Sequence, residues 1–128
     1  MTERVLRQGD VITVVFPEQT PQGREQEGYR PAIVVGIPER LGVPRFKLLI
    51  VVPMTTDKGM SWVTQSPMLY PRFPQGTANL VSASVALLDQ IRAIDPPRVI
   101  KYRGTLTPEQ YLSVRDGLFQ LFSFGKTV

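Results

Sequence analysis

Arginine, hydroxyl and carboxylate side chains must carry any chemistry in this chain, because its 128 residues include no histidine and no cysteine. Two segments place such groups where a polar loop joins an apolar run. In residues 23–35 a charged loop ends in Arg30 as a β-branched run begins, and in residues 48–56 a similar run ends at a proline and is followed by Thr55 and Thr56. We expect the ends of both runs to face one cleft, which would bring a guanidinium beside hydroxyl groups.

The composition is that of one ordinary globular domain. Residues 1–128 are 42% apolar and 20% charged, and this length suffices for one core but is short for two domains. The net charge of +4 favours an acidic partner such as nucleic acid, although the basic residues are spread rather than clustered. No apolar run approaches the roughly 18 to 20 residues of a membrane span, and the amino terminus does not resemble a signal sequence. We therefore expect a cytoplasmic protein with no membrane partner.

Alternating polar loops and β-branched runs predict a mainly β protein. Residues 11–16 are dense in β-branched side chains between glycine and proline, which predicts a first strand. Residues 17–30 predict a long polar loop, either a lid or a solvated excursion. Continuous apolar runs predict central strands, buried on both faces, at residues 32–36 and 46–52. Shorter strands are expected at residues 62–64, 79–88 and 99–102.

A change of period indicates a terminal helix. Thr107 and Gln110 form a capping-box pattern, and Pro108 occupies the first helical position, where its missing N–H donor costs nothing. Apolar residues then recur at spacings of three and four to about residue 123, so one helix face should pack on the sheet. These residues are Tyr111, Val114, Leu118, Leu121 and Phe122. The predicted fold is a small barrel of short strands capped by a carboxyl-terminal helix.

Three short motifs follow one another along the chain. They are Gly23-x-Glu25-Gln26-x-Gly28-x-Arg30-Pro31-Ala32, Pro53-Met54-Thr55, and Leu88-Asp89-Gln90-Ile91-Arg92-Ala93-Ile94-Asp95. Together they resemble the motifs of the MazF/PemK (Kid) toxins of type II toxin-antitoxin modules. The resemblance extends from Gly9-Asp10 to the last helix and so covers most of the chain. No motif is specific alone, but their joint occurrence in this order is.

The resemblance implies a fold, an activity and partners. The fold would be a single toxin domain, an SH3-like β-barrel of the CcdB/MazF/Kid type, in a homodimer. The activity would be that of an mRNA interferase, a metal-independent and sequence-selective endoribonuclease that cleaves single-stranded RNA. A cognate antitoxin would lay its extended acidic tail over the dimer groove. No cofactor is implied, and the sequence has no carboxylate cluster with metal-ligand spacing.

The family's catalytic arginine and threonine fall on Arg30 and Thr55. Metal-free cleavage of RNA uses the 2′-hydroxyl of the substrate as the nucleophile. Arginine keeps its proton and offers a planar fork for two phosphate oxygens, so Arg30 is expected to stabilise the phosphorane-like transition state. Thr55 would donate a hydrogen bond to the scissile phosphate or help to relay a proton. Without the motif, Thr55 has the commoner interpretation of a strand-end residue bonded to a backbone group, and Thr56 is an alternative hydroxyl.

The proton acceptor is less well defined by the sequence. Glu25 stands where family members carry a glutamate that influences cleavage, and as a general base it would accept the 2′-hydroxyl proton. The other interpretation is a solvated glutamate paired with Arg24. In the PemK/Kid branch an arginine two residues before the motif's aspartate is assigned to catalysis, but Leu87 occupies that position here. The Kid assignment, which also uses a histidine, is therefore in doubt, and weight shifts to Arg30 and Thr55.

Residues for reading RNA are expected around the same motifs. Gln90 can pair with a base edge, and Arg92 can meet a phosphate or stack on a base. Asp89 is either a base-edge acceptor or a cap of the following turn. Tyr29 and Trp62 can stack on unpaired bases, although a single tryptophan is more often part of the core. The expected RNA-binding residues are Gln26, Tyr29, Thr56, Asp89, Gln90 and Arg92.

Other functions remain open at the level of the sequence. A CcdB-like gyrase poison would share the fold and the dimer but would not need Arg30 and Thr55 together. A nucleic-acid-binding or general SH3-like interaction module would have no cleavage activity. For a ribonuclease, residues 57–77, which include Trp62 and several prolines, are the candidate segment for setting the RNA recognition sequence.

Overall fold

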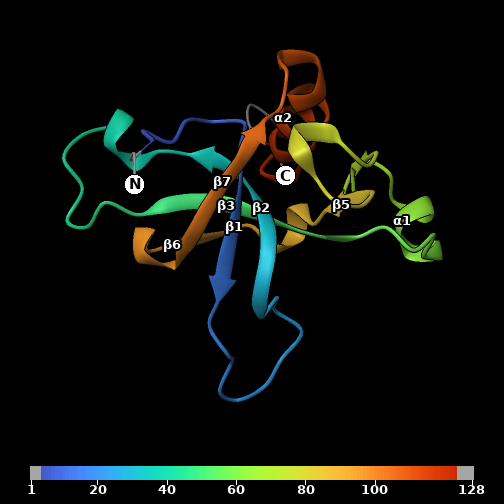
Figure 1. The fold of residues 1–128 in the computed structure, drawn as a ribbon, viewed down its shortest axis with the longest axis horizontal. Coiled ribbons are helices and arrows are strands. Elements are labelled where there is room, and N and C mark those ends of the chain that lie inside the picture. The colour runs from blue at the N-terminus through green and yellow to red at the C-terminus, as the bar shows by residue number, and fades with distance from the viewer. Residues whose placement is uncertain (1–3, 124–128) are drawn as a thin grey trace.

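The computed structural model describes residues 4–123, in which a seven-stranded antiparallel sheet is followed by a helix (Figure 1). The strands are β1 (Asp10–Phe16), β2 (Gly28–Gly36), β3 (Leu49–Thr56), β4 (Arg72–Phe73), β5 (Ser84–Ala86), β6 (Arg92–Ile94) and β7 (Val99–Thr105). The helices are α1 (Ser61–Gln65) and α2 (Pro108–Leu121), with short 3₁₀ turns between the strands. The expected mainly β fold with a carboxyl-terminal helix is confirmed.

Strand β3 has two partners along one of its edges. Residues 49–51 pair with β6, and residues 54–56 pair with β5. Its other edge pairs with β2, in the strand order β4-β5-β3-β2-β1-β7. Among residues 4–123 the end strands β4 and β7 do not pair with each other, so the sheet is open and does not close into the barrel that the sequence suggests.

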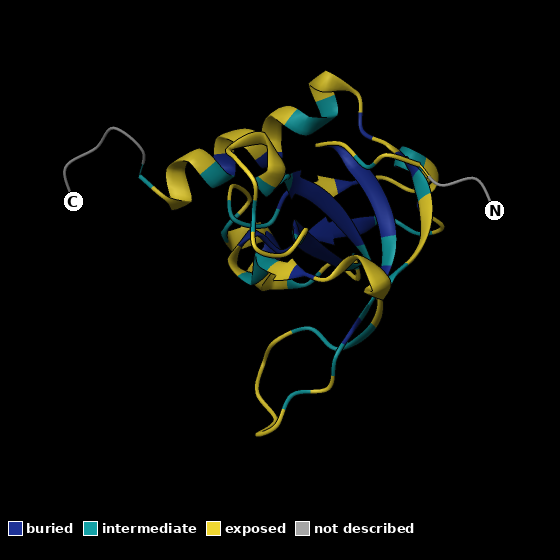
Figure 2. Cartoon of the chain, turned by 90° about the vertical axis from the view of Figure 1, so that its left-hand side faces the viewer, coloured by how far each residue is buried: buried dark blue, intermediate teal, exposed yellow. Residues whose placement is uncertain are grey.

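The residues of the central strands are largely buried (Figure 2). Successive side chains of a strand point in opposite directions, so these residues contribute to two core clusters, one on each face of the sheet. One core cluster contains Val11 and Ile33, with Val114 of α2 packed into it. A second cluster contains Ile12 and Val34 from the same two strands. Burying a side chain of this size stabilises a fold by about 1.5 to 3 kcal/mol. The buried side chains therefore fix the positions of β1 and β2, and with them the polar side chains at the ends of these strands.

Asp10 is a buried acidic side chain at the start of β1. Its carboxylate accepts hydrogen bonds from the Arg4 guanidinium at 3.2 Å, from the Arg7 backbone N–H at 2.9 Å and from Thr105 Oγ1 at 2.7 Å. Burial alone would raise the pKa of Asp10, but these bonds together hold its pKa below the ordinary value. The carboxylate thus ties the segment before β1 to β7.

Helix α2 begins where the capping box predicts. The Gln110 N–H donates to Thr107 Oγ1 at 3.1 Å, and the Thr107 N–H donates to Gln110 Oε1 at 2.8 Å. Two of the N–H groups that a helix start leaves without helical partners are therefore satisfied reciprocally. The sequence pattern and the observed start of the helix agree.

The apolar stripe of α2 is buried only in part. Val114 is fully buried, and Gly117 lies so close to the body of the protein that a Cβ there would be 2.8 Å from the Met68 carbonyl oxygen. The end of the helix projects past the sheet (Figure 2). Leu121 and Phe122, expected to pack on the sheet, are instead 41% and 51% exposed.

Residues 62–64 form part of helix α1, so the strand predicted there is wrong. β-Branched and aromatic residues favour strands because they fit a half-buried pleated surface, and in the described structure this segment has no strand partner. Val63 is buried, but Trp62 is 44% exposed and meets Tyr70 edge-on, with ring centroids 4.8 Å apart. The tryptophan is therefore not a core residue.

Within residues 79–88 only Ser84–Ala86 form a strand, β5. Gly76, Ala78 and Asn79 have positive φ angles of 91°, 47° and 62°, so the chain turns sharply before it enters that strand. Three other boundaries differ from the expectation: β2 starts at Gly28, inside the predicted loop; β3 runs from Leu49 to Thr56; and β7 continues to Thr105. Pro53 does not end β3, since it pairs with Ala32 and its carbonyl accepts the Leu87 N–H at 2.9 Å.

Candidate active site

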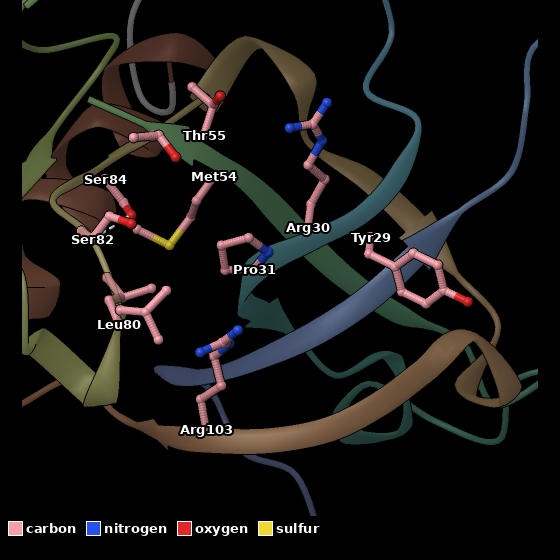
Figure 3. A pocket seen from close by; sticks show the side chains of 11 residues that line it. Tyr29, Arg30, Pro31, Met54, Thr55, Leu80, Ser82, Ser84 and Arg103 are labelled. Atoms are coloured by element: carbon pink, nitrogen blue, oxygen red, sulfur yellow. Dashed lines mark hydrogen bonds between the residues drawn. The ribbon is translucent and has the colours of Figure 1, made fainter. Parts of the chain in front are cut away.

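A cavity of about 150 Å³ lies at the ends of β2 and β3 (Figure 3). Four residues expected from the sequence line it: Tyr29, Arg30, Thr55 and Thr56. The other walls come from Pro31 and Met54, from residues 80–84 and from Arg103 of β7. The lining includes two arginines and no carboxylate, and a cleft with charge of one sign attracts ions of the other. The cavity therefore suits an anionic group such as a phosphodiester.

Strand pairing brings Arg30 and Thr55 together. The β2–β3 ladder ends at Ala32 opposite Pro53, and two residues beyond that pair stand Arg30 on one strand and Thr55 on the other. Residues two apart on a strand share a face, so both side chains leave the sheet on the same side. Figure 3 shows them on neighbouring strands, with the Thr55 hydroxyl on the side nearer to the guanidinium.

The Arg30 guanidinium is anchored at one nitrogen only. Its Nε donates to the Glu27 carbonyl oxygen at 3.1 Å. Within residues 4–123 no hydrogen bond or ion pair uses its two terminal nitrogens. The side chain is half-buried, so its charge is partly removed from water. These two nitrogens can therefore bind two oxygens of a ligand phosphate.

The hydroxyl of Thr55 is also unused. In the described part of the chain it makes no hydrogen bond to a backbone group, so the interpretation of Thr55 as a strand-end residue that satisfies the backbone is not supported. Thr55 is half-buried and pairs with Val85, whereas Thr56 is exposed and pairs with Ser84. Thr55 is the hydroxyl that stands across from Arg30.

A second cavity, of about 290 Å³, holds most of the other expected residues. Its lining residues are Gln19, Glu25, Asp89, Gln90, Ile91 and Arg92. Glu25 is exposed, and in the described structure it forms no ion pair with Arg24. The structure thus separates Glu25 from Arg30 and Thr55, which line the first cavity.

Gln90 tethers the long loop between β1 and β2. The Gln26 N–H donates to Gln90 Oε1 at 3.2 Å, and Gln90 Nε2 donates to the Arg24 carbonyl oxygen at 3.1 Å. The loop, residues 17–27, projects from the sheet in both overall views (Figures 1 and 2). The amide of Gln90 is therefore engaged by the loop backbone, and Gln26 Oε1 is buried without a hydrogen-bond partner among the described residues.

Asp89 is bonded to the segment that contains α1. Its Oδ2 accepts a hydrogen bond from the Tyr70 hydroxyl at 2.7 Å. This bond, with a smaller effect of burial, raises the pKa of Tyr70 to about 12. Asp89 lies within a 3₁₀ turn, Leu88–Gln90, and its side chain does not cap that turn. It thus links the second cavity to the pair formed by Tyr70 and Trp62.

Two further expected residues are placed for contact with a ligand. Tyr29 is 72% exposed at the edge of the first cavity, so its ring is free to stack. Arg92 pairs with Val51 across β6 and β3, and its guanidinium lies 5.1 Å from the ring centroid of Phe16. The cation–π contact with Phe16 orients the Arg92 guanidinium. Arg92 also lines the second cavity, where the guanidinium can contact a ligand.

Sequence reasoning missed one wall of the first cavity. The missed residues are Leu80, Val81, Ser82, Ser84 and Arg103. Ser82 and Ser84 stand in a segment of apolar residues interspersed with serines, a signal that is visible in the sequence. Ser84 Oγ donates to the Ser82 carbonyl at 2.9 Å, which shapes this wall. Arg103 belongs to none of the three motifs.

Comparison with protein families matches residues 7–122 to the PemK-like, MazF-like toxin of type II toxin-antitoxin systems. The chain belongs to this toxin family. The matched region contains every residue that lines the two cavities, and it confirms the resemblance carried by the three motifs. Among curated proteins, none matches the chain.

Solved structures of toxins share the fold over nearly the whole chain. MazF (Form-I) from Deinococcus radiodurans is 24% identical, with a TM-score of 0.71 over 95% of this chain and 100% of that one. The MazE-MazF (Form-II) structure from the same organism matches at 25% identity and TM-score 0.67, over 96% and 100%. An endoribonuclease in complex with its cognate antitoxin, from a mycobacterial species, matches at 15% and 0.66, over 96% and 100%. These matches do not favour a CcdB-like gyrase poison.

The part of the chain that the structure describes has neither a cluster of metal-binding side chains nor a membrane-spanning helix. No group of three or more histidine, cysteine or acidic side chains within residues 4–123 is arranged to hold a metal ion. None of the helices in that range has the length and apolar character needed to cross a membrane.

Proposed function

We propose that this chain is a metal-independent, sequence-selective endoribonuclease, the toxin of a toxin-antitoxin pair, which cleaves single-stranded RNA. Membership of the MazF/PemK family supports this activity. The observation that carries the proposal is the first cavity, which both Arg30 and Thr55 line at the ends of paired strands. The terminal nitrogens of Arg30 and the hydroxyl of Thr55 have no partner in residues 4–123. Both groups are thus available to one phosphodiester.

Cleavage would proceed by attack of the RNA 2′-oxygen on the adjacent phosphorus. The new bond closes a 2′,3′-cyclic phosphate as the bond from phosphorus to the 5′-oxygen breaks, and that oxygen takes up a proton. Arg30 would bind the non-bridging oxygens, on which negative charge develops, and Thr55 would donate a hydrogen bond to the same group. Donors that are already in place act without reorganisation, which is the main contribution that this cavity can make.

Glu25 is proposed to accept the proton of the 2′-hydroxyl. Because it lines the second cavity, this role requires the RNA or loop 17–27 to bring the carboxylate to the scissile group. The RNA strand would then span both cavities. Gln26, Tyr29, Thr56, Asp89, Gln90 and Arg92 are proposed to contact it, by stacking and by hydrogen bonds to splayed bases. We further propose a cytoplasmic homodimer whose cognate antitoxin covers this surface with an acidic extended tail.

The decisive experiment incubates the purified protein with a long single-stranded RNA in the presence of EDTA. We expect discrete fragments that end in a cyclic phosphate or its hydrolysis product, at a rate that the chelator does not change. Arg30→Gln and Thr55→Val serve as matched inactive variants. Intact RNA at high protein concentration would contradict the nuclease activity, and gyrase-dependent breaks in supercoiled DNA would instead support a gyrase poison.

A further inference from the structure

Arg103 places a second guanidinium at the cavity of Arg30. In Figure 3 the two arginines lie on either side of Pro31, one toward Thr55 and the other toward β7. The reaction proposed above uses Arg30 at the scissile phosphate and gives Arg103 no part. The function of the positively charged Arg103 side chain at this cavity is therefore still to be explained.

A β-bulge in β7 directs this side chain. In the pairing of β1 with β7, Val11 stands opposite Gly104 and Ile12 opposite Tyr102, so Arg103 is the extra residue. A bulge breaks the alternation of a strand and re-aims a side chain, and bulges are frequent beside active sites. In this position the side chain of Arg103 reaches the cavity wall.

Two hydrogen bonds hold Arg103 in this position. Its Nε donates to Thr13 Oγ1 at 2.8 Å, and its carbonyl oxygen accepts from Asn79 Nδ2 at 2.8 Å. Ala78 and Asn79 adopt left-handed φ angles of 47° and 62°, which residues with a Cβ rarely do. That turn touches the strand directly, because a Cβ on Gly104 would lie 2.8 Å from the Ala78 carbonyl carbon. An unfavourable turn is thus packed against the bulge.

The charge of Arg103 is not compensated in the described structure. Within residues 4–123 its terminal nitrogens make no hydrogen bond or ion pair, and no carboxylate lines the cavity. An oriented guanidinium without a partner is suited to a phosphate from outside the protein. In Figure 3 Pro31 lies between Arg103 and Arg30, an arrangement that favours two separate phosphates over one shared by both arginines.

We propose that Arg103 is a second phosphate-binding residue, which holds the RNA phosphate next to the scissile one. This inference rests on the proposed function. Because the neighbouring phosphate does not change its charge during the reaction, the contact has equal strength in the ground state and in the transition state. Such uniform binding lowers KM and leaves kcat unchanged, in contrast to a contact made only in the transition state.

The test compares Arg103→Gln with two milder variants. Arg103→Lys keeps the charge but loses the Nε bond, and Thr13→Val removes only the acceptor of that bond. The matched control is Arg115→Gln on α2, which removes the same charge from an exposed arginine paired with Asp116. Thermal unfolding of every variant establishes that it is folded.

Binding is measured by fluorescence anisotropy on a fully 2′-O-methylated single-stranded RNA of mixed sequence, which lacks the nucleophile. We expect Arg103→Gln to weaken binding about tenfold, as the loss of one charge-assisted hydrogen bond would. The slope of log K against log salt should decrease by about 0.7, as for one lost phosphate contact on a single strand. Thr13→Val and Arg103→Lys should weaken binding less and keep the slope. On cleavable RNA, Arg103→Gln should raise KM at nearly constant kcat.

Four outcomes would overturn the proposal. Binding and salt slope of Arg103→Gln equal to those of Arg115→Gln would show that Arg103 contacts no phosphate. A fall in kcat at constant KM would place it on the transition state. If Arg103→Gln does not fold, Thr13→Val carries the test: an affinity equal to that of the wild type would overturn the proposal that Arg103, oriented by its Nε bond to Thr13, holds the phosphate. A wild-type protein that binds methylated RNA but cleaves none would refute the nuclease activity alone, and one that binds no RNA would refute both.

Discussion

Replacing Thr55 with valine removes one hydroxyl from the candidate active site and nearly preserves the shape of the side chain. The hydroxyl has no hydrogen-bond partner in the described structure, so its loss leaves no buried group unsatisfied. Valine is at least as favourable as threonine in a strand. We therefore expect the free energy of unfolding to change by less than about 0.5 kcal/mol.

The effect of Thr55→Val on the reaction should be much larger. Loss of one preorganised donor to the developing negative charge costs about 2.7 to 4 kcal/mol, or about 10² to 10³ in kcat. The assay follows cleavage of an RNA that carries a fluorophore and a quencher, in EDTA, with urea unfolding measured on the same preparation. Thr56→Val is the comparison, because Thr56 is the exposed neighbour on the same strand and is proposed to contact the RNA rather than the reacting phosphate, so its loss should raise KM and leave kcat nearly unchanged. Wild-type kcat in Thr55→Val, or a larger loss in Thr56→Val, would refute this reasoning.

Three further predictions concern the first cavity, the start of β1 and the long loop. Arg30→Ala should lower kcat at least about 10²-fold in the same cleavage assay, because it removes the guanidinium from the transition-state charge; near-normal cleavage would contradict its role. Burial raises the pKa of Asp10, but the hydrogen bonds from Arg4, Arg7 and Thr105 together hold it below its ordinary value. The stabilisation is therefore present above about pH 4 and is lost as the pH falls through the lowered pKa. Asp10→Asn should therefore lower the free energy of unfolding by about 2 kcal/mol at pH 7. In urea unfolding, the fall of this free energy at acid pH should be shallower than in the wild type, and an equally steep fall would contradict the role of Asp10. Gln90→Leu cuts both tethers of loop 17–27, so trypsin should cleave this loop about tenfold faster, and an unchanged rate would show that other contacts hold it.

The parts of the fold that local sequence dictates are predictable. Strand β1 is a β-branched run between breakers, and the start of α2 is fixed by the bonds between Thr107 and Gln110. The sequence predicts a strand at residues 62–64, but they form helix α1, because β-propensity reflects the fit to a pleated surface and this segment has no neighbouring strand. The last turn of α2 carries apolar residues with the expected spacing, yet it extends beyond the sheet that would bury them.

The candidate site is predictable only as far as its motifs reach. Arg30 and Thr55 carry recognisable flanking residues, and the β2–β3 pairing brings them together. The division into two cavities depends on the course of loop 17–27, which its composition does not specify. Arg103 depends on a register shift between β1 and β7, and such a shift follows from packing between distant segments rather than from local sequence.

The position of Arg30 relative to Thr55 is set by the main-chain ladder that ends at Ala32 and Pro53. Of the groups proposed to contact the RNA, Gln26 lies outside that ladder on loop 17–27, and Asp89 and Gln90 lie outside it on the 3₁₀ turn Leu88–Gln90. Substitutions in those connections leave the hydrogen bonds of the sheet intact. If the proposed function is correct, the residues that select the RNA can change while Arg30 and Thr55 keep their positions. Related toxins can then differ in the RNA they cut and share one cleavage reaction.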